Sequence, residues 1–257
     1  MNRPAQAATL FLLGAALLHA GLTDLYLRYV KAGLRPLLLA SGAVLIVAAL
    51  ATAWYDRRHN RPTPANQAPP TPTRPDHAGH LDHPDHAHPE PRISWLLVLP
   101  VLALILIAPP ALGSYSALRT GTALQKPFGY TALPPGDTPL PLSLVDYAGR
   151  AAYDHGRSLH HRPVRVTGFL ALDRKGAPYL VRMALNCCAA DARPVKIALT
   201  GKLPPVLRPD AWLEVTGTYT PLRTRDPVNN GLIPYLKVTS AHPVPVPHDP
   251  YDETWNT

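Results

Sequence analysis

Two clusters of metal-ligating side chains stand out in this sequence of 257 residues. The first is a tract from Asp76 to Glu90, which packs five histidines, three aspartates and one glutamate into fifteen residues. Imidazoles bind Zn(II), Ni(II) and Cu(II), and carboxylates add oxygen ligands, so a flexible chain with both favours a weak metal site. The alternative is a solvated polar linker whose histidines bind nothing. The ligands that we expect for the metal site are His77, His80, His83, His86, His88, Asp82 and Asp85.

The second cluster is the adjacent pair Cys187-Cys188, followed by Asp191. Neighbouring Cα atoms lie ~3.8 Å apart, closer than the roughly 4.4 to 6.8 Å of ordinary disulfides, so an internal disulfide would be strained. In a tight turn both thiols face one ligand, and Asp191 then shares the side of Cys187. We therefore expect a soft-metal site for Zn or Cu, a labile redox pair or a partner contact. The alternative is two small buried apolar residues at the end of a strand.

Composition excludes several classes of function. The chain has two cysteines, too few for a disulfide framework, and 32 prolines, too many for a coiled coil. It contains no P-loop, no dinucleotide fingerprint and no catalytic-triad phrase, so we predict no catalytic residues and no enzyme activity. The net charge of +8 suggests nucleic acid, but much of it flanks apolar segments and the strands carry few aromatic residues for stacking. We therefore expect no nucleic-acid partner.

Three apolar segments are long enough to cross a bilayer, whose core needs ~20 residues of helix. The first two place two transmembrane helices in residues 1–59, although a cleaved signal peptide is the alternative for the first. The third predicts a transmembrane helix over residues 92–118, with the Pro109-Pro110 pair near its end. The segments are residues 7–23, 36–55 and 93–118.

The charges beside these segments predict how the chain is oriented. Asp56-Arg57-Arg58 follows the second segment directly, and Arg92 precedes the third. Because cations gather on the cytoplasmic side, the linker at residues 60–91 is expected inside and the C-terminal half outside. Nine prolines and few aliphatic residues in that linker predict a disordered loop.

The C-terminal half is predicted to form a small β domain over residues 142–247, after a Pro-rich connector at residues 119–141. Ser143 and Asp146 fit a capping box for a helix that ends at Gly156. Glycines at positions 168 and 217 stand in the shared phrase Val-Thr-Gly, where they would permit the sharp coiling that closes a five-stranded barrel. A small open antiparallel sheet is the alternative, and residues 248–257 are expected to form a tail. The predicted strands cover residues 162–173, 178–185, 194–199, 211–220 and 234–246.

The predicted fold class is therefore membrane α plus β, with three transmembrane helices followed by an OB-like five-stranded β-barrel. Three phrases in the β domain resemble the YcgQ-like family of bacterial membrane proteins, which are regarded as permease subunits. They are residues 182–192, which hold Cys-Cys-x-x-Asp-Ala, residues 210–218 and residues 246–251. Gly168-Phe169 and the order of spans, His-rich loop and β domain also look like the family. The long proline-rich linker departs from the family's pattern.

The resemblance implies an accessory half of a two-protein system in the cytoplasmic membrane. Its other half would be a multi-spanning permease subunit, with the lipid bilayer as the second partner. The resemblance carries over only Cys187, Cys188 and Asp191, to which we add Arg182 at the start of the same phrase as an expected ligand or partner site. Two alternatives stay open, a stand-alone metal-handling membrane protein and a membrane-tethered thiol redox protein.

Overall fold

The computed structural model describes residues 3–59, 99, 102–103, 106–107, 110–136 and 139–252. The chain divides into two compact units, one of Met1–His19 with Leu37–Ala108 and one of Ala20–Pro36 with Pro109–Thr257. The predicted loop at residues 60–91 and most of the predicted third span lie outside the described residues.

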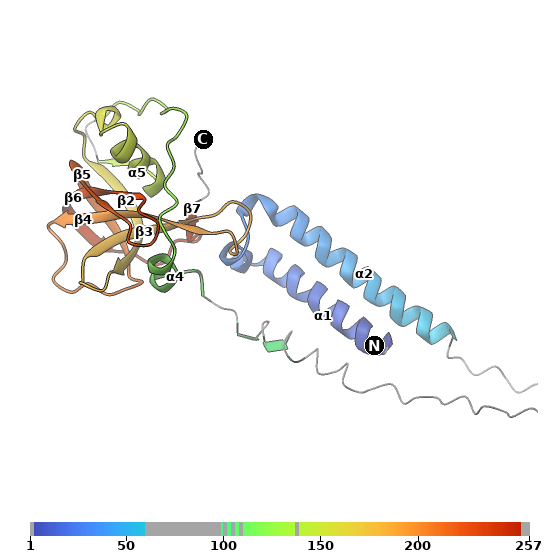
Figure 1. Ribbon diagram of the computed structural model, residues 1–257. Coiled ribbons are helices and arrows are strands. Elements are labelled where there is room, and N and C mark those ends of the chain that lie inside the picture. Colours follow the sequence, from blue (N-terminus) through green and yellow to red (C-terminus); the bar gives the residue numbers. More distant parts are fainter. Residues whose placement is uncertain are drawn as a thin grey trace, which may run out of the picture. The chain divides into compact units, whose positions relative to one another are not determined.

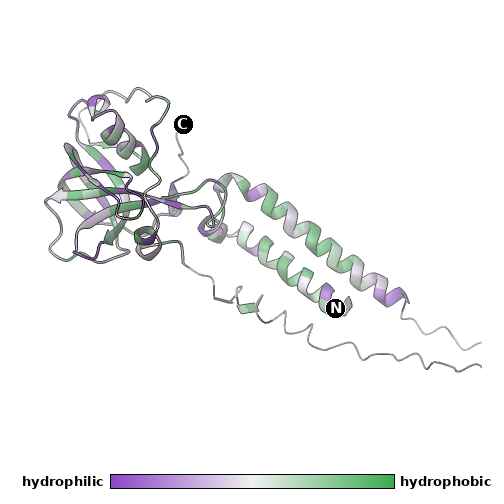
Figure 2. Ribbon diagram, in the orientation of Figure 1, coloured by the Kyte–Doolittle hydropathy of each residue, from purple (hydrophilic) through white to green (hydrophobic). Residues whose placement is uncertain are grey.

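The first unit contains most of two long helices, α1 (Arg3–Leu22) and α2 (Arg35–His59). Apolar residues cover both along most of their length (Figure 2). By length and composition each is able to span a membrane, over Ala5–Leu22 and Ala32–Arg58. Only 17% and 11% of these two stretches are buried, so neither helix is the core helix of a soluble domain.

Glycines let α1 and α2 pack closely. A Cβ atom at Gly14 would lie 2.9 Å from the carbonyl oxygen of Gly42, and one at Gly42 would lie 2.9 Å from the Leu18 side chain. Small residues that allow backbones to approach are typical of contacts between helices in membranes. The two helices therefore form a hairpin whose outer apolar side chains, among them Val44 and Val47, stay exposed.

The second unit is built on a closed β-barrel, shown with its helices in Figure 1. In chain order its helices are η1 (Asp24–Arg28), η2 (Ala32–Leu34), α4 (Ser114–Arg119), α5 (Leu144–Tyr153) and η4 (Arg157–Leu159). Its strands are β1 (Leu140–Pro141), β2 (Val164–Leu172), β3 (Pro178–Ala184), β4 (Arg193–Gly201), β5 (Trp212–Arg225), β6 (Leu232–Pro243) and β7 (Tyr251–Asp252).

Five strands close the barrel in the order β2-β5-β6-β4-β3, with β3 paired back to β2. β2 pairs with β5 over Val164–Phe169 and with β3 over Phe169–Leu172, so one strand serves both neighbours. All of these pairings are antiparallel except that of β4 with β6. The closed barrel confirms the five-stranded prediction and excludes the open sheet.

Gly168 and Gly217, the two glycines expected to permit coiling of the strands, lie at close approaches between neighbouring strands. A Cβ at Gly168 would come within 2.7 Å of the Val181 carbonyl oxygen, and one at Gly217 within 2.5 Å of the Lys237 carbonyl oxygen. The register between β5 and β6 also shifts between Thr216 and Gly217. The two glycines therefore allow the strands to coil and the barrel to close.

α5 packs against the interior of the barrel and covers its core. Leu144, Tyr147 and Ala148 on this helix are buried among inward side chains from all five barrel strands. Ser143 caps the helix, because its hydroxyl oxygen accepts a hydrogen bond of 3.0 Å from the Asp146 N–H. This confirms the predicted cap and helix, which ends at Tyr153, just before the predicted Gly156.

A second apolar cluster lies on the other face of β2 and β3 and includes Phe169 and Trp212, whose ring centres are 5.8 Å apart. Ala117 of α4 is completely buried in it. Residues 110–118, predicted as the end of the third span, therefore belong to the barrel unit instead. The Pro109-Pro110 pair is the signal that separates them from the apolar segment, because proline ends a helix.

The predicted tail also joins the barrel. Tyr251 and Asp252 form β7, which runs parallel to β3 and pairs with Met183 and Ala184. Two residues are too few to show the alternation by which strands are identified in a sequence, and for this reason β7 was missed.

Candidate functional site

The two cysteines lie in the loop that joins β3 to β4. Asp191 organises this loop, because its carboxylate accepts hydrogen bonds from the N–H groups of Asn186 (3.1 Å) and Cys187 (2.9 Å). Its own N–H donates to the Cys188 carbonyl at 3.0 Å. The loop is thus a tight turn that brings both thiols and the carboxylate together.

The three side chains converge closely enough to share a ligand. The Cys187 thiol donates to Oδ2 of Asp191 at 2.8 Å, and one ligand atom from each of Cys187, Cys188 and Asp191 lies within 4.8 Å of the others. Cys187 is exposed and Cys188 half-buried, and both are free thiols. Among the described residues this is the one group of three such side chains. The expected histidine ligands at positions 77, 80, 83, 86 and 88, with Asp82 and Asp85, lie outside the described residues.

The hydrogen bond to Asp191 favours the protonated form of the Cys187 thiol. The hydrogen bond to Asp191, followed by the neighbouring Cys188, raises the pKa of Cys187 from 9.0 to about 11. Burial alone would raise the pKa of Asp191, but the hydrogen bonds from Cys187 and from backbone N–H groups hold it below its usual value. The loop therefore presents a carboxylate beside the protonated thiol of Cys187.

The cysteine loop also holds the segment that connects α1 to α2. Val30 forms a β-bridge with Cys188, and the Lys31 N–H donates to the Cys187 carbonyl at 3.1 Å. The Ala189 N–H donates to the Tyr29 carbonyl at 2.7 Å. These backbone contacts join residues more than 150 positions apart, so no local sequence pattern predicts them.

Tyr251 ties the same segment to the barrel at a second point. Its hydroxyl donates to the Arg28 carbonyl at 2.9 Å and accepts from the Leu112 N–H at 3.3 Å. The side chain is only 2% exposed, and burial raises the pKa of Tyr251. One buried hydroxyl thus joins β7, the α1–α2 connection and the residues before α4.

Arg182 contacts the segment around Tyr251 rather than the thiols. Its Nη2 donates to the carbonyls of Tyr251 (2.8 Å) and Asp249 (3.3 Å), and its guanidinium carbon lies 5.0 Å from the centre of the Trp212 ring. Burial lowers the pKa of Arg182, partly offset by nearby Asp252 and Asp249. The expected ligand residue is therefore one that positions the C-terminal segment.

Sequence reasoning missed a groove of about 780 Å³ in the barrel unit. It lies between η1, α4, β5 and the segment before β7, and apolar rings such as Phe169 and Trp212 line part of it. Asp24 and His248 also line it and pair at 2.6 Å between Oδ2 and Nε2. Residues from 210–212 and 246–250 contribute to this groove, and only the fold brings these distant segments together.

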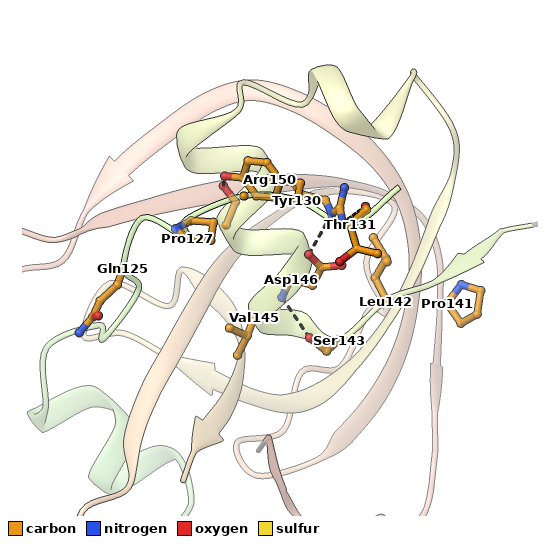
Figure 3. A pocket seen from close by; sticks show the side chains of 12 residues that line it. Gln125, Pro127, Tyr130, Thr131, Pro141, Leu142, Ser143, Val145, Asp146 and Arg150 are labelled. Atoms are coloured by element: carbon orange, nitrogen blue, oxygen red, sulfur yellow. Dashed lines mark hydrogen bonds and ion pairs between the residues drawn. The ribbon is translucent and has the colours of Figure 1, made fainter. Parts of the chain in front are cut away.

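A second cavity, of about 320 Å³, lies between the connector and α5 (Figure 3). Arg150 dominates it, with Nε donating to Asp146 and Nη2 to the Thr131 carbonyl, each at 2.8 Å. Tyr130 donates to the Gly149 carbonyl at 2.9 Å. Because these polar groups bind one another, the arrangement fastens the connector to the helix.

Comparison with known proteins covers the barrel unit. Residues 150–252 match the family described as the DUF1980 C-terminal domain. No curated protein and no solved structure matches this chain. The matched residues contain all five barrel strands, β7 and the cysteine loop, so the part of the chain that is similar to this family is the part that forms the candidate site.

Proposed function

We propose that this chain is a non-enzymatic membrane subunit that holds an OB-like barrel against the bilayer, beside a multi-spanning permease. The observation that carries the proposal is the docking of residues 24–35 on the barrel. This segment connects two helices able to span a membrane, and it is fixed to the cysteine loop and to Tyr251. A barrel fixed to such a connection is held at the membrane surface.

The strand order supports the OB-like interpretation. A five-stranded barrel whose first strand pairs with both the second and the fourth has the Greek-key arrangement of that fold. Here β2 pairs with β3 and β5, and the single parallel pairing joins β4 to β6. Such barrels bind ligands or partners through their strands and loops, and the cysteine loop is one of these loops.

The docked segment also supports three crossings. If α1 and α2 both cross the bilayer, the barrel lies on the same side as the segment that connects them, because the barrel and this connecting segment form one unit. α2 leads away from that side, so the chain must return between residues 59 and 110. Residues 93–109 carry no charge and are apolar, with the length of roughly 17 to 25 residues that one crossing needs. Together with the cations at 57, 58 and 92, this supports a barrel that lies outside the cytoplasm.

The exposed faces of the helices support a partner within the membrane. Leu37, Val44 and Leu50 on α2 are 65%, 66% and 59% exposed, which suits lipid or the helices of another protein. A chain with three spans suits an accessory role, so we assign transport to the permease subunit.

Purification of the tagged full-length protein from its own membranes in mild detergent tests the accessory role. We expect a multi-spanning membrane protein to co-elute in stoichiometric amount, as identified by mass spectrometry. A comparison variant with Gly42→Leu, whose larger side chain would separate α1 from α2, should reduce the amount of the co-eluting protein. Recovery of the chain alone from the native membranes would refute the proposal.

Thiol labelling tests the topology separately. A membrane-impermeant maleimide applied to intact cells should label Cys187, which is exposed. In a chain with Cys187→Ser, Cys188→Ser and Ala65→Cys, the new thiol lies in the predicted loop and should be labelled only after lysis. Equal labelling of both positions in intact cells would contradict the return crossing.

A further inference from the structure

We infer that Cys187, Cys188 and Asp191 form a binding site for one thiophilic divalent ion of the Zn(II) class. The inference goes beyond the accessory role and does not depend on it. It concerns the cysteine loop alone, and it assigns the site to the point where the barrel holds the α1–α2 connection.

The donor set selects the ion. Two sulfur ligands and one carboxylate oxygen suit Zn(II), because thiolates favour soft or borderline ions whereas Mg(II) and Ca(II) require oxygen ligands. A tetrahedral ion with bonds of ~2.0 to 2.3 Å separates its ligands by roughly 3.3 to 3.8 Å. The three ligand atoms already lie within 4.8 Å of one another. Side-chain rotations that move these atoms by about 1 Å would therefore bring them to one ion.

The loop is organised before any ion binds. Backbone N–H groups of Asn186 and Cys187 hold the Asp191 carboxylate, and the bridge to Val30 fixes the backbone of Cys188. Hydrogen bonds of this kind orient metal ligands and raise affinity. When the ion binds, Cys187 gives up its hydrogen bond to Asp191, both thiol protons pass to solvent, and two thiolates and one carboxylate ligate the ion.

The site also leaves one coordination position open. Three protein ligands satisfy three corners of a tetrahedron, and Cys187 is exposed to solvent. Zinc sites with three protein ligands keep a fourth place for water or an incoming ligand. An ion held here can therefore be taken up or handed on by exchange at that fourth position.

Zinc titration of the metal-stripped, full-length protein in detergent tests the site, with bound metal measured by equilibrium dialysis. We expect one tightly bound ion per chain. The matched control replaces His77, His80, His83, His86 and His88 with Ala and should keep that ion. Cys187→Ser with Cys188→Ser should remove it, and Asp191→Asn should weaken it by roughly 10-fold or more.

Two spectroscopic and chemical readouts separate loss of the site from loss of the fold. Co(II) in place of Zn(II) should give thiolate charge-transfer absorption in the wild type and the five-histidine control. Zn(II) should also protect Cys187 of the wild type from alkylation. Unchanged stoichiometry in the double Ser variant, loss of the ion in the five-histidine control, or alkylation that zinc leaves unaltered would each overturn the inference.

Discussion

At the scale of single residues, Asp191 determines how the thiols of the cysteine loop behave. Its carboxylate accepts the Cys187 S–H and two backbone N–H groups, which favours the protonated thiol and the ionised acid together. Because the thiolate is the nucleophile, a raised pKa makes the metal-free thiol slow to react near neutral pH. A thiol oxidoreductase needs the opposite shift, so the raised pKa of Cys187 disfavours redox chemistry at the metal-free thiol, and a metal ion must displace the thiol proton to bind there.

The raised pKa predicts how alkylation of Cys187 depends on pH. In metal-stripped protein the alkylation rate of Cys187 should rise with a midpoint near 11 rather than 9, and Cys188→Ser should lower that midpoint without abolishing the shift, because the hydrogen bond to Asp191 remains. The hydrogen bond to Asp191 contributes fully below pH 9 and is lost as pH rises through the folded-state pKa. Asp191→Asn should move the midpoint back toward the ordinary value. A midpoint of 8 to 9 in the parent protein would contradict this account.

A buried ion pair provides the second residue-scale prediction. Lys196 Nζ lies 2.7 Å from Asp226 Oδ2, with side-chain exposures of 4% and 0%. Asp226 also accepts from the N–H of Thr122, and Lys196 donates to the Thr120 carbonyl. Removing one partner leaves a buried charge, so Lys196→Met should lower the free energy of unfolding by about 3 to 5 kcal/mol.

Thermal unfolding of the full chain in detergent, followed by near-ultraviolet circular dichroism, measures that loss. Lys175→Met is the matched control, because Lys175 is exposed in a turn, and it should change stability by less than about 0.5 kcal/mol. Equal melting temperatures for the two variants would show that the buried pair adds nothing.

At the scale of elements, closure of the barrel depends on the two glycines that let strands coil. Gly168→Ala and Gly217→Ala would each press a Cβ against a backbone carbonyl, at 2.7 and 2.5 Å. Because backbone cannot rotate away as a side chain can, each change should destabilise the chain by about 1 to 3 kcal/mol. Gly129→Ala meets nothing within 4 Å and should leave the same unfolding transition unchanged, whereas similar losses for all three would refute the closure argument.

The same elements show how far sequence patterns reach. Alternation identified β2 to β6, and the Ser143 cap located α5, because these signals are local. The sequence alone left a tight turn and a strand end as alternatives at Cys187, because the hydrogen bonds of Asp191 that decide between them cannot be read from residue types. β7 was missed because it is two residues long, and residues 110–118 were joined to a span because apolar composition does not distinguish lipid from a barrel surface. The groove and the docking of Tyr29 on Ala189 depend on long-range contacts that no local pattern carries.

At the scale of the whole molecule, the barrel unit closes on itself through segments distant in the sequence. Residues 20–36 and 109–257 form one unit, although α2 and the third apolar segment separate them along the chain. Each long loop costs entropy to close, and the hydrogen bonds at Cys187, Ala189 and Tyr251 offset that cost. The site and the α1–α2 connection are therefore mechanically linked, and a change at one reaches the other through a few backbone contacts.

Limited proteolysis tests this link through Tyr251, whose hydroxyl serves both Arg28 and Leu112. Tyr251→Phe keeps the buried ring but leaves one carbonyl and one N–H without their partner, at a cost of about 1 to 2 kcal/mol. Local opening of the connection should rise by roughly 5- to 30-fold, and trypsin, which cleaves after Arg and Lys unless proline follows, should cut faster after Arg28 and Lys31 in proportion. Tyr115→Phe removes a hydroxyl from a side chain that is 69% exposed and should leave the rate unaltered. Unchanged cleavage in Tyr251→Phe would mean that the cysteine loop alone holds the connection, whereas faster cleavage confined to residues 28–35 would show that the barrel is fastened to it at both points.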